Sequence, residues 1–182
     1  MLRRLLRVAA IGLLLSMGNS LAEAGEAEMT LLLELKDGTV VIELFPQLAP
    51  KHVARIKELV REGYYDGKTW HRVIDGFMAQ AGSLHGDGRG GTGQKLHAEF
   101  SEEKHVRGIA SMARTRDPNS ADAQFFIMLA PAPHLDGNYT VWGRVVSGMD
   151  FIENIKKGDQ NNNGTVVDPD IIVSMKVQGD VQ

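Results

Sequence analysis

Residues 70–82, WHRVIDGFMAQAG, consist of two short apolar runs on either side of the pair Asp75-Gly76. Asp-Gly between apolar runs is a strong signal for a β-hairpin, so the stretch predicts two antiparallel strands. Arg72 places a permanent positive charge in the first run, among residues that favour burial. Because buried arginines are rare, Arg72 is either a strand residue that faces water or the reactive group of a site.

The rest of the chain predicts more short strands and two helices. Helical spacing of apolar residues occurs at residues 49–62 and 149–156. Strand-like runs occupy residues 29–45, which form a hairpin around Lys36-Asp37-Gly38-Thr39, and residues 108–113, 124–129, 140–146 and 171–177. About eight short strands with two helices, and without regular strand–helix alternation, predict a mainly β fold. We expect a closed β-barrel or a sandwich with helical caps.

The first 24 residues form a separate segment. Residues 1–7, MLRRLLR, are basic, residues 8–17 are apolar, and SLAEA then offers small residues for cleavage after Ala22 or Ala24. The apolar run is far shorter than the ~20 residues that span a membrane. These features predict a cleavable signal peptide at residues 1–24 and a single exported domain at residues 25–182. We expect this domain in a bacterial periplasm, without membrane attachment after cleavage.

The net charge argues against one class of function, and the cysteine content excludes another. Residues 1–24 carry three arginines and one glutamate, so their removal takes the net charge from −3 to −5. Such a charge argues against nucleic-acid binding, which usually leaves a basic footprint. The chain has no cysteine, which excludes thiol chemistry. An exported domain without disulfides must be stabilised by its core.

Two loops match ligand motifs but lack the required context. Residues 86–91, GDGRGG, fit the dinucleotide pattern G-x-G-x-x-G, but no helix follows to hold a phosphate, so a surface loop is the better interpretation. In residues 159–170, DQNNNGTVVDPD, positions of a calcium loop are filled by Asp159, Asn161, Asn163, Gly164 and Asp170. Calcium stays a minor alternative to a turn, because Asp170 replaces the usual glutamate and a strand follows in place of a helix.

No other pattern points to a metal, a cofactor or a nucleophile. Four histidines that could suggest a metal lack close spacing and a surrounding carboxylate cluster: His85, His97, His105 and His134. No serine lies in a nucleophile elbow of the form G-x-S-x-G. We therefore expect neither a metal nor a cofactor. What remains is a group of apolar and amide residues around Arg72, namely Phe77, Met78, Gln80, Gln124, Phe126 and Leu135.

Three segments make the chain similar to a known family. They are HRVIDGFMAQAG (residues 71–82), GIASMARTRDPNSADAQFFIML (108–129) and HLDGNYTVWGRVVSGMDFIENI (134–155). In this order and spacing they resemble the cyclophilins, a family of peptidyl-prolyl cis-trans isomerases. The resemblance covers about residues 31–177. It implies a closed eight-stranded antiparallel β-barrel capped by two α-helices.

The resemblance also assigns roles to individual residues. Arg72 matches the catalytic arginine, and Gln80 matches the residue near its guanidinium. Gln124 matches a side chain that holds the substrate backbone. The proline pocket is matched by Phe77, Met78, Phe126 and Leu135.

Four further positions of the groove are matched, three of them with departures from the family pattern. Ala113 and Arg114 match the segment that lies along the peptide, although the better-known members have asparagine at the place of Arg114. His134 replaces a tryptophan that is important for tight cyclosporin binding in eukaryotic members. Tyr139 stands where those members carry histidine. These departures imply weak cyclosporin binding more than a loss of catalysis.

The register of the first hairpin can be checked against these roles. A two-residue turn at Asp75-Gly76 would pair Arg72 with Ala79. Arg72 and Gln80 would then lie on opposite faces, because side chains alternate along a strand. The resemblance requires the two side chains in one site, so we predict a turn that is irregular or one residue longer.

The resemblance implies a peptidyl-prolyl cis-trans isomerase that accelerates X-Pro isomerisation during the folding of exported proteins. Its partners would be unfolded or folding proline-containing polypeptides, and we expect a monomer. The alternative is a non-catalytic proline-peptide-binding module, or a holdase chaperone, that uses the same groove. Loss of Arg72 would abolish isomerase activity and leave simple holding nearly intact. A third option, a lipocalin-like barrel for small ligands, would ignore proline peptides.

Overall fold

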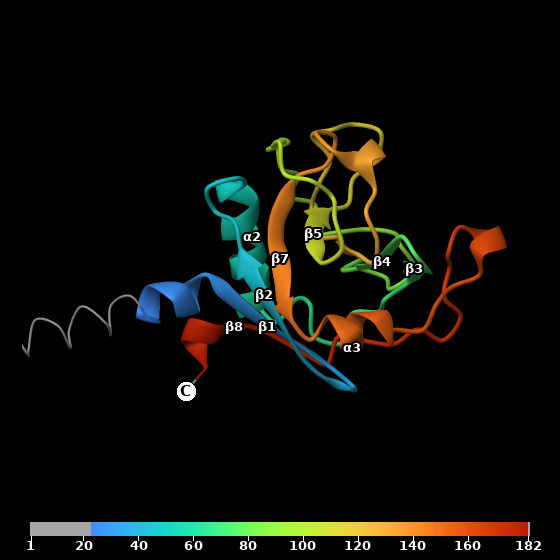
Figure 1. Cartoon of the computed structure of the whole chain (residues 1–182), viewed down its shortest axis with the longest axis horizontal. Helices are drawn as coiled ribbons and strands as arrows, with labels where there is room; N and C mark the ends of the chain where they lie inside the picture. The colour runs from blue at the N-terminus through green and yellow to red at the C-terminus, as the bar shows by residue number, and fades with distance from the viewer. Residues whose placement is uncertain (1–22, 182) are drawn as a thin grey trace, which may run out of the picture.

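The structure, a computed structural model, describes residues 23–181. The predicted signal peptide at residues 1–24 therefore lies almost entirely outside the described residues. Within the described part, no helix is both long and apolar enough to cross a membrane. The described chain begins as a helix at residues 23–28 and then enters an antiparallel sheet (Figure 1).

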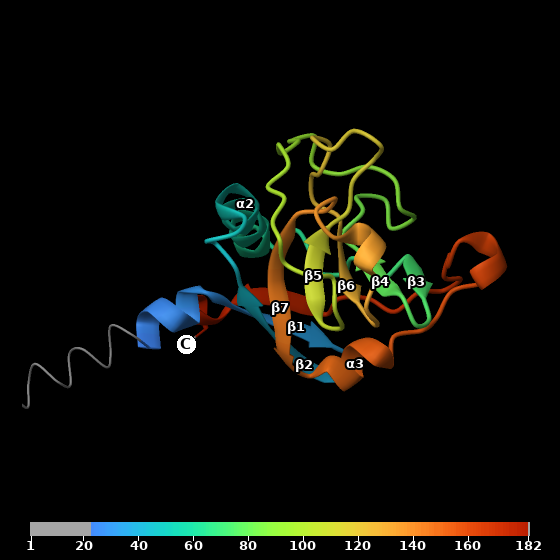
Figure 2. The same cartoon turned by 45° about the horizontal axis from the view of Figure 1, so that its top comes forward.

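Eight strands form one antiparallel sheet that curls around an apolar core (Figure 2). The strands are β1 (Thr30–Leu35), β2 (Gly38–Leu44), β3 (Arg72–Ile74), β4 (Met78–Ala81), β5 (Ile109–Met112), β6 (Phe125–Met128), β7 (Val141–Ser147) and β8 (Ser174–Val177). Their order in the sheet is β3-β4-β6-β5-β7-β2-β1-β8. The prediction of a mainly β fold with eight antiparallel strands is confirmed.

The two edge strands, β3 and β8, are linked through the segments that precede them. Thr69 and Ile171 form an isolated antiparallel bridge. Next to it, the Trp70 N–H donates to the Asp170 carbonyl at 2.9 Å. These bonds satisfy backbone groups that a free sheet edge would leave open. The seam of the curled sheet therefore consists of single bridges and not of a continuous strand ladder.

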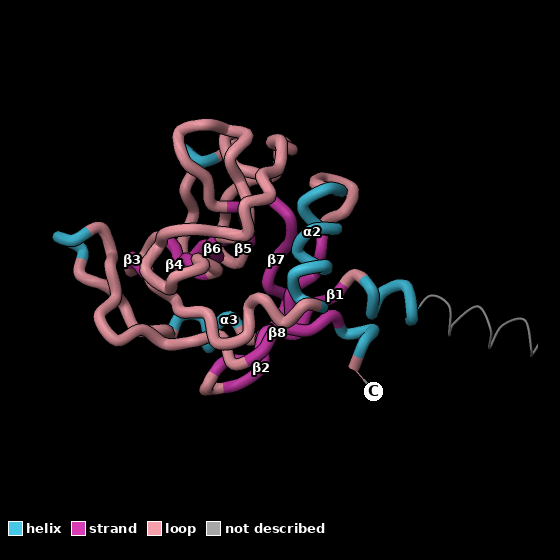
Figure 3. Tube along the Cα trace, turned by 180° about the vertical axis from the view of Figure 1, so that it is seen from behind, coloured by secondary structure: helices cyan, strands magenta, loops and turns pink. Residues whose placement is uncertain are grey.

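Two helices cover the core, as Figures 1 and 3 show: α2 (Pro50–Arg61) and α3 (Met149–Glu153). Pro50 lies in the first turn of α2, where its missing N–H leaves no helical bond unmade. Gly63 follows the helix with a φ of 68°, a left-handed conformation that favours glycine. The apolar face of α2 is buried through Val53, Ile56, Leu59 and Val60.

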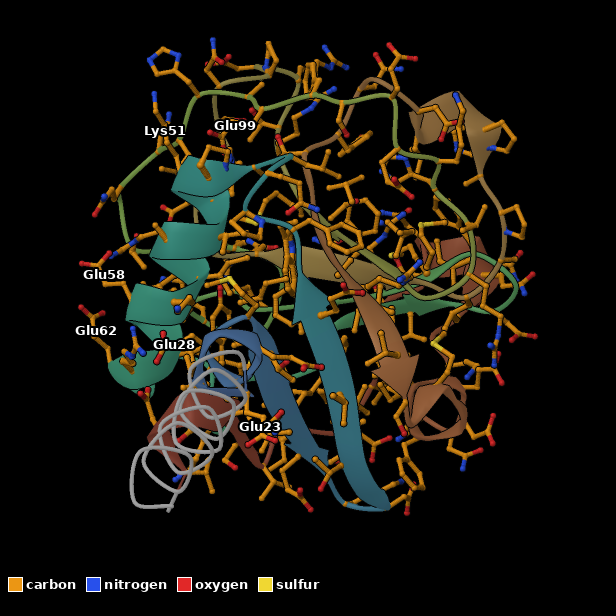
Figure 4. All side chains as sticks on the ribbon, turned by 60° about the vertical axis from the view of Figure 1, so that its left-hand side comes forward. Glu23, Glu28, Lys51, Glu58, Glu62 and Glu99 are labelled. Carbon is orange, nitrogen blue, oxygen red and sulfur yellow. The ribbon has the colours of Figure 1, made fainter. Side chains whose placement is uncertain are left out.

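The N-terminal end of α2 is capped from a loop far along the chain. Ala49, the N-cap residue, provides no side-chain hydrogen bond. Instead the Glu99 carboxylate accepts the N–H groups of Lys51 at 3.2 Å and His52 at 3.1 Å. Figure 4 shows Glu99 beside Lys51 at this end of the helix. The negative charge also faces the positive end of the helix dipole, so Glu99 both stabilises α2 and ties its own loop to it.

Two predicted elements are shorter than expected. The helix predicted at residues 149–156 ends at Glu153, because the Lys156 N–H donates to the Asp170 carboxylate at 2.9 Å in place of a helical carbonyl. The strand predicted at residues 171–177 begins at Ser174, and Ile171 pairs through the isolated bridge.

Both ends of the described chain are bound to α2. Arg61 donates Nη2 to Glu28 Oε1 at 3.0 Å and Nε to Asp180 Oδ2 at 2.8 Å. Lys57, one turn earlier, also binds Glu28. An exposed ion pair contributes only about 0–1 kcal/mol. Together these pairs nevertheless hold the first helical residues and the C-terminal segment against one helix (Figures 1 and 4).

Acidification from pH 7.5 to 5.5 is expected to lower the stability of the fold. Burial lowers the pKa of His52, His71 and His105 from the ordinary value of 6.5, although Glu99 and Asp136 oppose this for His52 and His105. As the pH falls below 6.5, these histidines therefore bind protons more readily in the unfolded chain than in the folded chain. Stability is then fully present above pH 6.5 and is lost as the pH falls below it.

Thermal unfolding at pH 7.5, 6.5 and 5.5 measures this effect. His52→Gln should flatten the dependence of Tm on pH, whereas His85→Gln and His97→Gln, at solvent-exposed positions, should leave it as in the wild type. A wild-type Tm that stays constant down to pH 5.5 would contradict the prediction. Carboxylates such as Glu28 have a pKa lowered below 4.5 by their cationic partners, so their contribution is lost only at lower pH.

Candidate active site

The turn between β3 and β4 has three residues, as the geometric check predicted. Arg72 pairs with Gln80 and Ile74 with Met78, which leaves residues 75–77 in the turn. Gly76 has a φ of 66°, and the Phe77 N–H donates to the Ile74 carbonyl at 3.1 Å. The extra residue puts Arg72 and Gln80 directly opposite each other, and therefore on the same face of the sheet.

Cross-strand pairing continues this arrangement over four strands. Gln80 on β4 lies opposite Phe126 on β6, and Phe126 lies opposite Ser111 on β5. Arg72, Gln80, Phe126 and Ser111 thus form one row across the sheet, on the face that points away from the main core. Phe125, the residue before Phe126, is fully buried on the other face. The alternation along β6 separates the site from the main core.

The outer face carries a second apolar cluster with a pocket of about 110 Å³. Met78, Phe126 and Leu135 are 2%, 5% and 7% exposed, so the floor of the pocket is firmly packed. The lining residues are Arg72, Phe77, Met78, Gln80, Ala113, Arg114, Phe126, Leu135 and Tyr139. These are all of the predicted site residues except Gln124 and His134, which lie beside the pocket.

The Arg72 guanidinium forms one wall of the pocket and is held from two sides. Its Nη1 donates to Gln80 Oε1 at 3.2 Å and lies 3.8 Å from Met78 Sδ. Its Nε donates to the Asn163 carbonyl and its Nη2 to Asn163 Oδ1, both at 3.0 Å. Partial burial lowers the pKa of Arg72 from its usual value, yet an arginine stays charged in a protein. A fixed positive charge therefore faces an apolar pocket.

Gln80 connects Arg72 to the neighbouring hollow. Its Nε2 donates to Gln124 Oε1 at 3.0 Å. The Gln124 Nε2 in turn donates to the carbonyls of Gly88 and Gly90, at 3.0 Å each. Gln124 thus lines an adjoining hollow of about 380 Å³ that shares Gln80 with the main pocket. The glycine-rich loop that matched a dinucleotide motif serves here as a wall of this hollow.

The floor residue Phe126 rests on a buried polar group that sequence reasoning missed. The His105 ring stacks on Phe126 with centroids 6.2 Å apart. His105 Nδ1 lies 3.2 Å from Asp136 Oδ1, and its Nε2 lies 3.0 Å from Ser111 Oγ. Since Nδ1 donates to the carboxylate, the neutral ring accepts the Ser111 hydroxyl at Nε2. These bonds fix the ring that supports the floor.

Arg114 and His134 lie at the rim. The Arg114 guanidinium lies over the Tyr139 ring at 4.5 Å and donates Nε and Nη2 to the Asn138 carbonyl at 3.0 and 2.8 Å. The His134 ring stacks on Phe77 with centroids 5.7 Å apart. Arg114 is therefore ordered by the segment that precedes β7 and is part of the pocket wall.

The loop that matched a calcium motif reaches the site. Asn163 from this loop binds Arg72, and Asp159 accepts the Asn161 N–H at 2.9 Å. Asp170 binds Lys36 Nζ at 2.9 Å. Over residues 23–181, no group of three or more histidine, aspartate or glutamate side chains is arranged to hold a metal ion. The Asn-Asn-Asn-Gly run signalled a turn, but nothing in the sequence indicated that the turn folds against β3.

The geometry defines what the pocket can do. It offers a small apolar floor, the guanidinium groups of Arg72 and Arg114 in the wall and amide groups beside them, which suits a compact apolar ring next to a peptide backbone. Serine, histidine and carboxylate side chains do not occur among its lining residues. A charged donor held beside an apolar floor therefore suits noncovalent stabilisation of a bound group.

Known proteins share this architecture. A family model described as "Cyclophilin type peptidyl-prolyl cis-trans isomerase/CLD" matches residues 30–177. A Brucella suis protein named "Probable peptidyl-prolyl cis-trans isomerase" is 51% identical over 173 residues, covering 88% of each chain. Peptidyl-prolyl cis-trans isomerase B of Bacillus subtilis is 44% identical over 128 residues, covering 69% of this chain and 89% of that one.

Solved structures agree. Cyclophilin AquaCyp293 from Hirschia baltica matches with a TM-score of 0.76 and 31% identity, covering 86% of this chain and 76% of that one. A cyclophilin-type isomerase of Cryptosporidium parvum, crystallised in the presence of the dipeptide Ala-Pro, matches with a TM-score of 0.74 and 30% identity, covering 81% and 98%. The resemblance of the three sequence segments is thereby confirmed. The chain belongs to the cyclophilin family of peptidyl-prolyl cis-trans isomerases.

Proposed function

We propose that Arg72 is the catalytic group of this isomerase and that the chain accelerates X-Pro isomerisation during the folding of exported proteins. The observation that supports the first part most strongly is the placement of a fixed guanidinium in the wall of an apolar pocket. Phe77, Met78, Phe126 and Leu135 would hold the proline ring. Gln80 would orient Arg72, and Gln124, Ala113 and Arg114 would lie along the peptide.

The reaction needs only a twist about one bond. The X-Pro bond has a barrier of about 18–20 kcal/mol, because the nitrogen lone pair is delocalised into the carbonyl. At the top of the barrier the lone pair is localised on a pyramidal nitrogen. A donor aimed at that nitrogen binds the transition state better than either ground state, so Arg72 lowers the barrier. Arginine suits this task because it stays charged and presents a rigid fan of donors.

The available interactions match the size of the task. A rate gain of about 10⁵ requires about 7 kcal/mol of differential stabilisation. A hydrogen bond to a charged group contributes about 1.5–3 kcal/mol, and a prearranged geometry adds to it. The three hydrogen bonds to Asn163 and Gln80 use three of the five N–H donors of Arg72. Of the other two, one lies near the weak acceptor Met78 Sδ, so donors remain for the substrate.

The second part of the proposal, the export of the chain, is supported by the basic and apolar character of residues 1–24. It is tested by fractionating cells of a Gram-negative bacterium that express the full chain. The expected result is a periplasmic product whose sequence starts at Glu23 or Gly25. A product that keeps Met1 and stays in the cytoplasm would overturn the exported role and leave the isomerase role untouched.

Refolding of a periplasmic protein whose slow phase arises from X-Pro isomerisation tests the folding role. The mature chain should accelerate this phase at substoichiometric concentration, and Arg72→Ala should accelerate it far less at the same concentration. A holdase would instead suppress aggregation equally with both chains, and only at stoichiometric amounts. Because of Arg114, His134 and Tyr139 we also expect weak cyclosporin binding. Independently of these residues, we expect a monomer.

A further inference from the structure

We infer that Asn163, in the loop of residues 159–165, is a positioning residue for Arg72. It accepts two of the three hydrogen bonds that fix the guanidinium, one at its carbonyl and one at Oδ1, each at 3.0 Å. Gln80 accepts the third from the opposite side. With acceptors on both sides, the plane of the guanidinium is set before a substrate enters.

The loop is seated on β3 through its backbone. The Val73 N–H donates to the Gly164 carbonyl at 2.8 Å, and the Gly158 N–H donates to the Val73 carbonyl at 2.9 Å. Val73 is the residue that follows Arg72, so the loop is tied to the strand that carries the catalytic group. The loop packs closely against β3 at Gly164, where an added Cβ would lie 2.3 Å from Ile74 Cγ1. Asn163 therefore has a defined position relative to Arg72.

The backbone of Asn163 is also unusual. Its φ is 54°, and Asp168 is the other non-glycine residue of the described chain with a positive φ. Asparagine tolerates this conformation better than most residues, and glycine adopts it freely. The conformation lets the carbonyl and the side-chain oxygen of one residue both face the same guanidinium. The run of asparagines that resembled a calcium loop thus acquires a role in organising the site.

This inference rests on the proposed role of Arg72. A guanidinium that becomes ordered only during the reaction stabilises the transition state less, because part of the interaction energy is used to order it. Loss of the Asn163 side chain should therefore act on the transition state and not on the binding of the peptide. The expected signature is a lower kcat with nearly unchanged KM.

Asn163→Gly tests the inference, because it removes Oδ1 without straining the left-handed backbone. We expect kcat for an X-Pro tetrapeptide to fall about tenfold, with KM changed less than about twofold and Tm unchanged. The NMR signal of the Arg72 Nε–H should broaden or exchange faster. Asn161→Gly is the matched control: Asn161 is exposed on the same loop and donates its backbone N–H to Asp159, so kcat should stay at the wild-type value.

A double-mutant cycle decides whether Asn163 acts through Arg72. In the Arg72→Ala background, Asn163→Gly should cause no further loss of the residual activity. A further tenfold loss there, or wild-type kcat in the single variant, would overturn the inference and leave the role of Arg72 intact. Full activity of Arg72→Ala itself would instead overturn the proposed function, and the inference with it.

Discussion

Replacement of Arg72 by alanine is expected to lower kcat/KM for an X-Pro peptide by about 10²- to 10³-fold, the usual cost of removing a donor aimed at a developing charge. The Arg72 guanidinium lines the apolar pocket and is held between Asn163 and Gln80. Catalysed cis-to-trans exchange of a proline tetrapeptide measures the effect. A residual activity should remain, because the apolar pocket still binds and orients the ring.

Arg72→Lys is the matched control for charge. Lysine keeps the positive charge but lacks the planar fork that reaches Asn163 and Gln80 together, so most of the activity should still be lost. Both variants should melt like the wild type, since Arg72 lies outside the main core. If Arg72→Ala exchanges the peptide as fast as the wild type, the arginine has no catalytic role and the pocket alone carries the reaction.

Phe125→Ala should cost about 3–5 kcal/mol of unfolding free energy, as is typical for removing a buried phenylalanine. Its ring is fully buried and meets Tyr65, Trp70 and Trp142 edge-on, with centroids 5.4 to 5.8 Å apart. The cavity left by the substitution is enclosed by these rings and cannot collapse easily. Since domains of this size are stable by only about 5–15 kcal/mol, the variant would be close to unfolding.

Phe126→Ala, the same substitution one residue later, is the control. Its ring lines a pocket that is open to solvent, so the loss of stability should be smaller, while kcat/KM should fall roughly tenfold or more from lost apolar contact with the proline ring. Urea unfolding and the tetrapeptide assay on both variants measure the two effects. The assignment of the two faces of β6 would be wrong if Phe126→Ala proved the more destabilising of the pair.

Much of the fold could be predicted because local patterns and tertiary packing agree. The spacing of Val53, Ile56, Leu59 and Val60 predicted α2, and the packing of this face against the barrel explains why the prediction is confirmed. Element ends were less predictable. The end of α3 at Glu153 depends on Asp170, which accepts the Lys156 N–H from a loop position 14 residues further along the chain.

The relative placement of site residues was predictable where it depended on a single strand or a single turn. A turn that is irregular or longer than two residues could be deduced, because the resemblance requires Arg72 and Gln80 on one face and a two-residue turn would separate them; the turn has three residues, 75–77. The supports of the site were not predictable. His105 reaches Phe126, and Asn163 reaches Arg72, through folded loops whose course no local pattern encodes.

The attachment of both ends of the described residues to α2 has a consequence for how the enzyme can be joined to other proteins. Glu28 and Asp180 meet at Arg61, and Figures 1 and 2 place this region on the side of the molecule opposite β3 and β4. A tether or fusion partner at either end would therefore leave access to the proline pocket free. A short linker joining the two ends would equally permit a circular permutation whose new termini are opened in an exposed loop.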